Sequence, residues 1–132
     1  MLAAVKKTPA RLAQQSGLTV DERIHMTVNV MRRQLAASMS VPELAKLTGW
    51  SRSHYADVFK TRMGCSVLQY FIRLRMQRAA ELIECGDQRV RQVATSLGFK
   101  DPLYFSRQFR RVHGVAPTVF RSHRRSRALG SR

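Results

Sequence analysis

The stretch that decides the fold is VRQVATSLGFKDPLYFSRQFRRVHGVAPTVFR, which covers residues 90–121. Its first part, residues 90–97, repeats apolar residues at the three- and four-residue spacing of one helix face, and Gly98 then ends the helix. Asp101 followed by Pro102 is a typical start for a second helix, because the carboxylate can accept from free backbone N–H groups. The pattern predicts two short helices joined by a tight turn, which is a helix-turn-helix.

The second of these helices is expected to have one buried face and one exposed face. Phe105, Phe109 and Val112 follow one another at four- and three-residue spacing, so we expect all three to face the core. Polar and basic residues fall on the opposite side. Gly114 should end this helix, and a further helix is expected to begin near Pro117, where proline's missing N–H costs nothing.

The same stretch resembles the C-terminal signature of the AraC/XylS family of bacterial transcription regulators, GF-x-D-P-x-YFSR-x-FR-x-x-x-G-x-x-P-x-x-FR. Many spacings hold over about 25 residues, which makes the likeness far more specific than a single short motif. It extends over about residues 21–124. The matching residues are Gly98, Phe99, Asp101, Pro102, Tyr104, Phe105, Ser106, Arg107, Phe109, Arg110, Gly114, Pro117, Phe120 and Arg121.

The resemblance implies a sequence-specific regulator that binds double-stranded promoter DNA and contacts RNA polymerase, and we expect an activator. Most members of the family carry an effector-binding or dimerisation domain ahead of this region, whereas about 20 residues precede it here. The chain is therefore either a short member controlled by its own abundance or a fragment of a longer regulator. In both cases we expect no small-molecule ligand, and binding as a monomer to an asymmetric site.

An internal repeat of about 50 residues predicts a second helix-turn-helix earlier in the chain. Ser40 precedes Glu43 at the spacing of a capping box, and Ser51 is expected to cap the following helix, which should run to about Met63. The repeated residues are Ala45, Gly49 and Trp50, which recur as Ala94, Gly98 and Phe99, and Tyr55, Phe59, Gly64 and Tyr70, which recur as Phe105, Phe109, Gly114 and Phe120.

These features predict an all-α fold of about seven helices, with two helix-turn-helix subdomains joined by a long central helix. A helix over residues 66–84 would measure roughly 28 Å, close to the ~34 Å between successive major grooves on one side of DNA. The first helix of the first subdomain is expected at 21–37. The expected division is a linker or flexible N-terminal segment at 1–20, a first subdomain at 21–65, a connecting helix at 66–85, a second subdomain at 86–124 and a basic tail at 125–132.

Charge indicates the class of partner. The 132 residues include 24 Lys or Arg and 8 Asp or Glu, for a net charge of +16, which favours a polyanion such as DNA. A non-specific basic architectural protein that binds nucleic acid is the alternative, since its charge would be similar. Duplicated helix-turn-helix units favour the sequence-specific regulator, because non-specific binding needs no paired recognition helices.

Each unit offers a set of candidate DNA-binding residues on and before its second helix. Arg and Lys suit phosphate contacts, and the resemblance implies that bases are contacted from the middle of the helix. The first set is Ser51, Arg52, Ser53, Ala56, Asp57 and Lys60; the second is Lys100, Pro102, Leu103, Ser106, Arg107 and Arg110.

Three of these candidates have distinct chemistry. Arg107 can donate to guanine O6 and N7, whereas Ala56 can only touch a thymine methyl group. Asp57 departs from the family, whose members often have a longer or basic residue there. It could accept from cytosine N4, orient Arg52, or repel phosphate.

Other classes of protein find little support in the sequence. The two cysteines, Cys65 and Cys85, form no disulfide framework, and the four histidines have no metal-ligand spacing, so no metal or cofactor is expected. No catalytic motif is present, and we expect no enzyme. No apolar run is long enough to cross a membrane and no signal peptide is seen, so we expect a cytoplasmic, nucleoid-associated protein.

Overall fold

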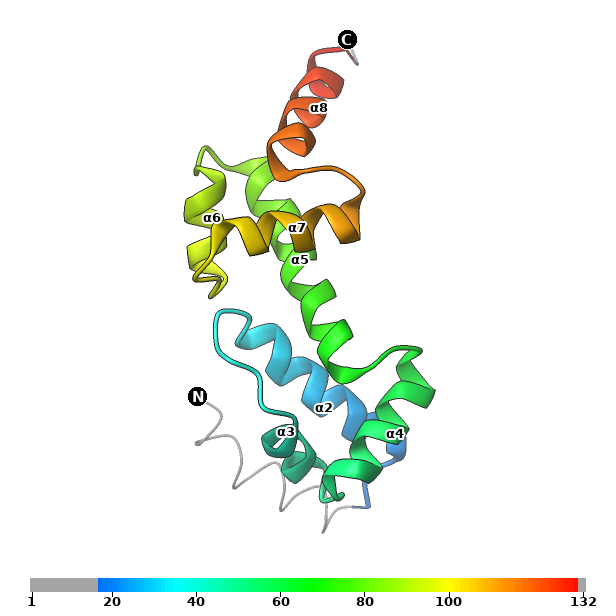
Figure 1. Ribbon diagram of the computed structural model, residues 1–132. Helices are drawn as coiled ribbons and strands as arrows, with labels where there is room; N and C mark the ends of the chain where they lie inside the picture. Colours follow the sequence, from blue (N-terminus) through cyan, green and yellow to red (C-terminus); the bar gives the residue numbers. More distant parts are fainter. Residues whose placement is uncertain (1–16, 131–132) are drawn as a thin grey trace. The chain divides into compact units, whose positions relative to one another are not determined.

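The structure is a computed structural model that describes residues 17–130, with side chains described for residues 17–124. Within this range the chain is entirely α-helical and contains seven helices, as expected (Figure 1). Of the predicted N-terminal linker, residues 1–16 lie outside the described residues. The helices are α2 (Val20–Arg33), α3 (Val41–Thr48), α4 (Arg52–Met63), α5 (Val67–Cys85), α6 (Val90–Ser96), α7 (Pro102–His113) and α8 (Pro117–Gly130).

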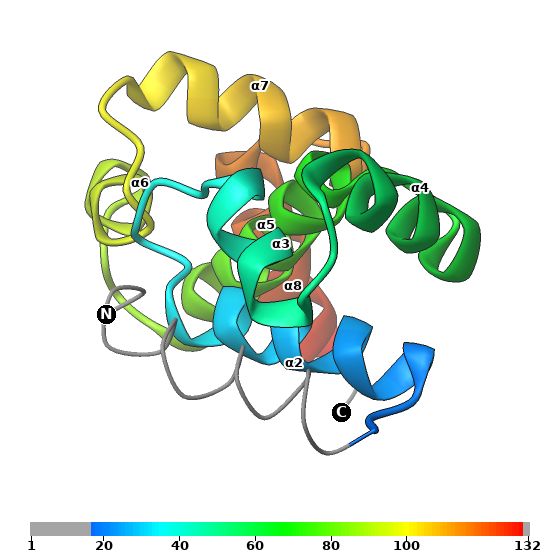
Figure 2. The ribbon, with the colours of Figure 1, turned by 90° about the horizontal axis from the view of Figure 1, so that it is seen from below.

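The helices form two compact units. The first unit ends at Phe71 and the second begins at Ile72, so α5 contributes residues to both. In the first unit α3 packs against both α2 and α4, and in the second unit α7 packs against α6 and α8. Figure 2 shows α3 beside α2 in a second view. Two helix-turn-helix units and a long helix between them are thus confirmed, while the exact subdomain limits stay predictions.

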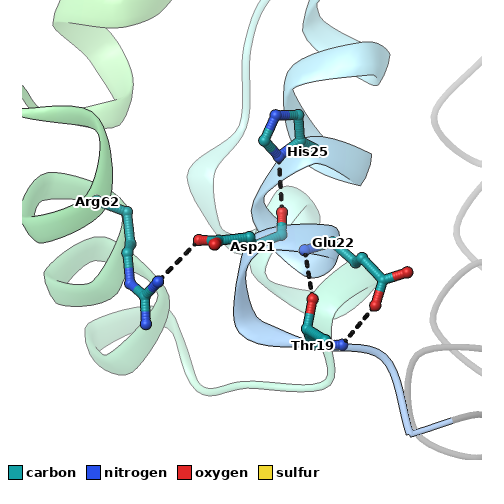
Figure 3. A network of polar contacts seen from close by, with 5 residues as sticks. All are labelled: Thr19, Asp21, Glu22, His25 and Arg62. Carbon is teal, nitrogen blue, oxygen red and sulfur yellow. Dashed lines mark hydrogen bonds and ion pairs between the residues drawn. The ribbon is translucent and has the colours of Figure 1, made fainter.

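The start of α2 is held by a reciprocal cap that the sequence analysis missed (Figure 3). The backbone N–H of Glu22 donates to Thr19 Oγ1 at 3.1 Å, and the N–H of Thr19 donates to Glu22 Oε1 at 2.9 Å. The bond from the Thr19 N–H is the main reason that the pKa of Glu22 lies below its ordinary value. Arg62 Nη1 in α4 donates to Asp21 Oδ1 at 2.9 Å, which joins α4 to the first turn of α2.

The predicted end of the first helix was wrong. We expected a helix to residue 37, but α2 ends at Arg33 and the chain turns. The backbone N–H of Gln34 donates to Met31 O, three residues back, and the N–H of Ala37 donates to Gln34 O in the same way. These short-range bonds replace the four-residue ladder of the α-helix, so the helix does not continue.

Aromatic residues at repeated positions form the centre of each core. Tyr55 and Phe59 in the first unit and Phe105 and Phe109 in the second are fully buried, which confirms them as core residues. Val112 was also predicted in the core, and this was wrong: it is 40% exposed. It lies in the last turn of α7, where the next residue, His113, takes the position toward the core: its ring lies 4.3 Å from that of Phe109 and 5.6 Å from that of Phe120.

The internal repeat is reproduced in three dimensions. The rings of Phe59 and Tyr70 meet edge to face with centroids 5.6 Å apart, and those of Phe109 and Phe120 do so at 5.4 Å. The glycines that end the helices repeat as well. Gly49 and Gly98 have φ of 80° and 85°, and Gly64 and Gly114 have φ of 81° and 83°, values that L-residues with a side chain rarely adopt.

Within the second unit, arginines anchor the last helix to the end of α5 and to the residues that follow it. Arg121 donates from Nε to Ile83 O at 3.1 Å and from Nη2 to Gln88 O at 2.6 Å, so it satisfies carbonyls where α5 ends. Arg124 pairs with Glu84 at 2.6 Å. The first arginines after Phe120 therefore have partners within the protein. The helix continues to Gly130, through most of the stretch expected as a basic tail, and residues 131–132 lie outside the described residues.

Candidate nucleic-acid interface

In the first unit the second helix of the helix-turn-helix is α4. Ser51 is its N-cap, and its hydroxyl accepts from the backbone N–H of His54 at 3.2 Å, as the sequence predicted. Because Tyr55 and Phe59 are buried toward the core, the opposite side of α4 faces solvent. Of the predicted site residues, Ser51, Arg52, Ser53, Asp57 and Lys60 are exposed and Ala56 is half-buried.

In the second unit the corresponding helix is α7. Asp101 caps it, and its Oδ1 accepts from the backbone N–H of Leu103 at 2.9 Å. Phe105 and Phe109 are buried, and the polar side is again left accessible. Lys100, Leu103, Arg107 and Arg110 are exposed, while Pro102 and Ser106 are half-buried. Each unit therefore gathers its own predicted residues on and just before one helix.

The two helices differ in charge. α7 carries Arg107, Arg110 and Arg111 and no acidic residue. α4 carries Arg52, Lys60 and Arg62 together with Asp57, and Arg62 is already paired with Asp21. Between the described side chains no ion pair joins Asp57 to Arg52. An electrostatic attraction to phosphate should therefore be stronger at α7 than at α4.

The structure also exposes residues that the predicted sets left out. The Tyr104 side chain is 47% exposed on α7, beside Leu103, which is 67% exposed. His54 is exposed in the first turn of α4, and Arg111 is exposed near the end of α7. The helical period could have predicted that Tyr104 is exposed, since it does not share the helix face of the buried residues Phe105 and Phe109. A tyrosine hydroxyl and an arginine are both suited to phosphate contacts.

Other kinds of site find no support in the described part of the chain. No group of three or more His, Cys, Asp or Glu side chains is placed to hold a metal ion there. Cys65 is buried and Cys85 is exposed. None of the described helices combines the length and the apolar character that crossing a membrane requires.

Comparison with known proteins identifies the fold. A family model described as "Helix-turn-helix domain" matches residues 44–123. The DNA-binding domain of AdpA, solved in complex with a target DNA, is 30% identical with a TM-score of 0.73, over 79% of this chain and 94% of that one. A transcriptional regulator of the AraC type from Chromobacterium violaceum shares the fold with a TM-score of 0.74 at 24% identity, over 79% and 93% of the two chains.

A curated relative supports the same conclusion at the sequence level. The HTH-type transcriptional activator RhaR of Pectobacterium atrosepticum is 31% identical over 99 residues, which are 75% of this chain and 35% of that protein. The chain spans between 30% and 44% of the length of the curated regulators compared. With its two helix-turn-helix units and the signature in residues 98–121, the chain belongs to the AraC/XylS family of helix-turn-helix transcription regulators.

Proposed function

We propose that the chain binds double-stranded promoter DNA sequence-specifically and regulates transcription, with α4 and α7 inserted into neighbouring major grooves. One observation carries the proposal: in both units the second helix of the helix-turn-helix buries two aromatic residues and exposes polar and basic ones. A helix exposed in this way is the element that enters the major groove in helix-turn-helix proteins. The AdpA domain, which was solved with its target DNA, supports DNA as the partner.

The exposed residues divide into two roles. Arg52, Lys60, Lys100 and Arg110 would bind phosphates, which supply affinity and position each helix. The helix N-termini at Ser51 and Asp101, with Pro102, would lie close to the backbone of the DNA. The residues proposed to contact base edges are Ser53, Ala56 and Asp57 on α4, and Leu103, Ser106 and Arg107 on α7.

Two base contacts can be stated most concretely. The Arg107 guanidinium would donate to O6 and N7 of a guanine, and Asp57 would accept from N4 of a cytosine. Asp57 is exposed and has no ion pair with Arg52, which leaves its carboxylate available for a base. A carboxylate on a helix that approaches DNA is repelled by phosphate, and a hydrogen bond from cytosine would offset this cost.

The biological role follows from the family. Its members are transcription regulators, so the chain is not an enzyme. We propose that it acts as an activator, as RhaR is named, and that it contacts RNA polymerase as well as DNA. Such a regulator would act in the cytoplasm, at the nucleoid. We expect it to need no cofactor and no small-molecule ligand within this chain.

Competition binding tests the proposal. A preferred site is first selected from random double-stranded oligonucleotides, and its affinity is then compared with that of random DNA at one salt concentration. We expect the selected site to bind at least ~10³-fold more tightly. Equal affinity for all sequences would instead support the alternative, a non-specific architectural protein.

A further inference from the structure

We propose that Arg23 and Arg75 are positioning residues, each of which holds the aromatic side chain in the turn before a recognition helix and so determines which bases that helix contacts. The inference rests on the proposed function, because it concerns base preference. Neither arginine belongs to the exposed DNA-facing sets on α4 and α7. Each acts within its own unit, Arg23 toward α4 and Arg75 toward α7.

In the first unit, Arg23 of α2 contacts the segment before its own helix, the end of α3 and the turn before α4. Its Nη1 donates to the carbonyl of Thr48, the last residue of α3, at 3.0 Å, and its Nε donates to Leu18 O at 3.3 Å. Its guanidinium carbon lies 5.4 Å from the centre of the Trp50 ring. This ring meets His54, in the first turn of α4, edge to face at 5.1 Å.

These contacts form a continuous path to the recognition helix. Trp50 comes directly before Ser51, the N-cap of α4. The Arg23 side chain thus binds both the end of α3 and the turn, and the turn residue touches the first turn of α4. Loss of Arg23 would free the turn without removing any side chain from the outer face of α4.

The second unit repeats the contact between an arginine and the aromatic residue of the turn. The Arg75 guanidinium carbon, on α5, lies 5.1 Å from the centre of the Phe99 ring, in the turn before α7. The Phe99 ring contacts Phe105 at 5.2 Å and Tyr104 at 6.1 Å between ring centroids, and both belong to the start of α7. Arg75 is half-buried, and this burial lowers the pKa of its guanidinium, an effect that nearby Tyr104 opposes. An arginine stays protonated in proteins nonetheless.

The repetition argues that the contact is more than an accident of packing. Trp50 and Phe99 are equivalent in the internal repeat, and each has over its ring an arginine from the helix that precedes its helix-turn-helix, α2 or α5. Arg23 and Arg75 are 52 residues apart, the same offset that separates Thr27 of α2 from Ala79 of α5, so they lie at corresponding positions of the two helices. The contact therefore occurs in both units although the connection after α2 is longer than the one after α5.

Precise placement matters because base contacts tolerate little displacement. Functional side chains must be held within roughly 0.5 Å and 10–20° of their productive geometry. A planar guanidinium can stack on a ring and donate to a carbonyl at the same time, and lysine cannot reproduce this geometry. An error in the turn would move every base-contacting residue of that helix together.

The test compares Arg23→Met and Arg75→Met with two matched controls in the intact chain. Arg32→Met and Arg78→Met remove the same charge from exposed positions on α2 and α5. Asp57→Asn and Arg107→Ala first establish which half of a selected site each helix contacts. Base discrimination is then measured by competition with oligonucleotides changed in one half at a time, and folding is checked by circular dichroism and thermal unfolding.

We expect Arg23→Met to lose about fivefold or more of its discrimination in the α4 half, the scale of one good base contact, while the α7 half is unchanged. Arg75→Met should show the reciprocal pattern, and both controls should keep wild-type discrimination in both halves. Arg23→Lys should behave like Arg23→Met, because charge without stacking is insufficient. This variant also tests the proposal if Arg23→Met does not fold.

Three results would overturn the inference. If affinity falls equally for all sequences and the slope of log K against log salt becomes shallower by about one, the arginines contact phosphate. A lower melting temperature with unchanged discrimination would make them structural only. Full discrimination in Arg23→Lys would show that stacking is unnecessary. A wild-type chain with no preference at all would reject the proposed function itself, before any variant is compared.

Discussion

At the scale of single residues, one difference between the two cores is a hydrogen-bonded pair of side chains in the first unit. The Tyr55 hydroxyl donates to Thr27 Oγ1 at 2.9 Å, and Thr27 donates to Ile24 O at 2.8 Å, with all of these residues buried. Burial raises the pKa of Tyr55 above its ordinary value, against the opposing effect of Thr27, so the phenol stays neutral. In the second unit the equivalent of Tyr55 is Phe105, and fully buried Ala79 lies 52 residues after Thr27.

This difference predicts coupling between the two hydroxyls. Thr27→Ala should destabilise the chain by about 1–3 kcal/mol, because it leaves the Tyr55 hydroxyl buried without its acceptor. Tyr55→Phe should cost about 1 kcal/mol, since Thr27 keeps its bond to Ile24. The double variant copies the Phe and Ala of the second unit, so we expect its cost to be smaller than the sum of the two. Urea unfolding of all four proteins measures the coupling, and strict additivity would contradict it.

Arg107 permits a second test at this scale. Arg107→Ala should weaken binding to the preferred site by about 1–3 kcal/mol and flatten the preference at one base pair, because the bidentate contact to guanine is lost. Competition binding against the four possible base pairs at each position detects this change. Affinity lost equally for every sequence would show that Arg107 contacts only phosphate.

At the scale of single elements, α7 shows how burial depends on its neighbours. Phe109 is fully buried and its ring contacts Phe120 of α8 at 5.4 Å, whereas Val112, three residues further on, is 40% exposed. Phe109→Ala should therefore cost about 3–5 kcal/mol of stability, by loss of buried area and creation of a cavity. Val112→Ala is the matched control on the same helix, and we expect a change within about 0.5 kcal/mol. Thermal unfolding compares the two, and equal losses would contradict this assignment.

Features that depend on neighbouring residues could be predicted from the sequence. Ser51 and Asp101 cap α4 and α7, and Gly98 follows the end of α6 in the left-handed conformation. These features could be predicted because each depends only on residues a few positions away. The cap at Thr19 had the same kind of signal, the T-x-x-E spacing to Glu22, and could have been found. The faces of α4 and α7 also follow from helical period alone.

Features that depend on tertiary contacts could not be predicted in this way. The bond between Tyr55 and Thr27 joins residues 28 positions apart, and nothing in the local pattern indicates it. The position of Arg23 over Trp50 is of the same kind. The prediction for Val112 was wrong because the helical period allows either a three- or a four-residue step after Phe109, and contact with Phe120 of α8 brings His113 to the core side instead. Which residues of the candidate site are exposed could be predicted from the sequence. The tertiary contacts that fix the recognition helices to the rest of each unit could not.

At the scale of the whole molecule, which carries a net charge of +16, the number of phosphates that basic residues neutralise should set the salt dependence of binding. Arg52, Lys60, Lys100 and Arg110 are all exposed, and each neutralised phosphate adds about −0.9 to the slope of log K against log salt. Four such contacts predict a slope of roughly −3.6 or steeper. Lys60→Ala should reduce the slope by about one and leave base preference unchanged, as titrations at several salt concentrations would show. A slope near zero would exclude phosphate contacts by these residues.

Gly64 and Gly114, which follow the last residues of α4 and α7, have a consequence for chirality. A Cβ atom added at either position would meet no other heavy atom within 4 Å, so only the backbone torsion opposes a side chain. The torsion that is unfavourable for an L-amino acid is the preferred one for its mirror image. D-alanine at Gly114, introduced by chemical ligation, should therefore stabilise the chain by about 0.4–1 kcal/mol through the unfolded state, and L-alanine should destabilise it. Opposite shifts of the melting temperature for the two enantiomers would show that handedness, rather than space, selects glycine where these helices stop.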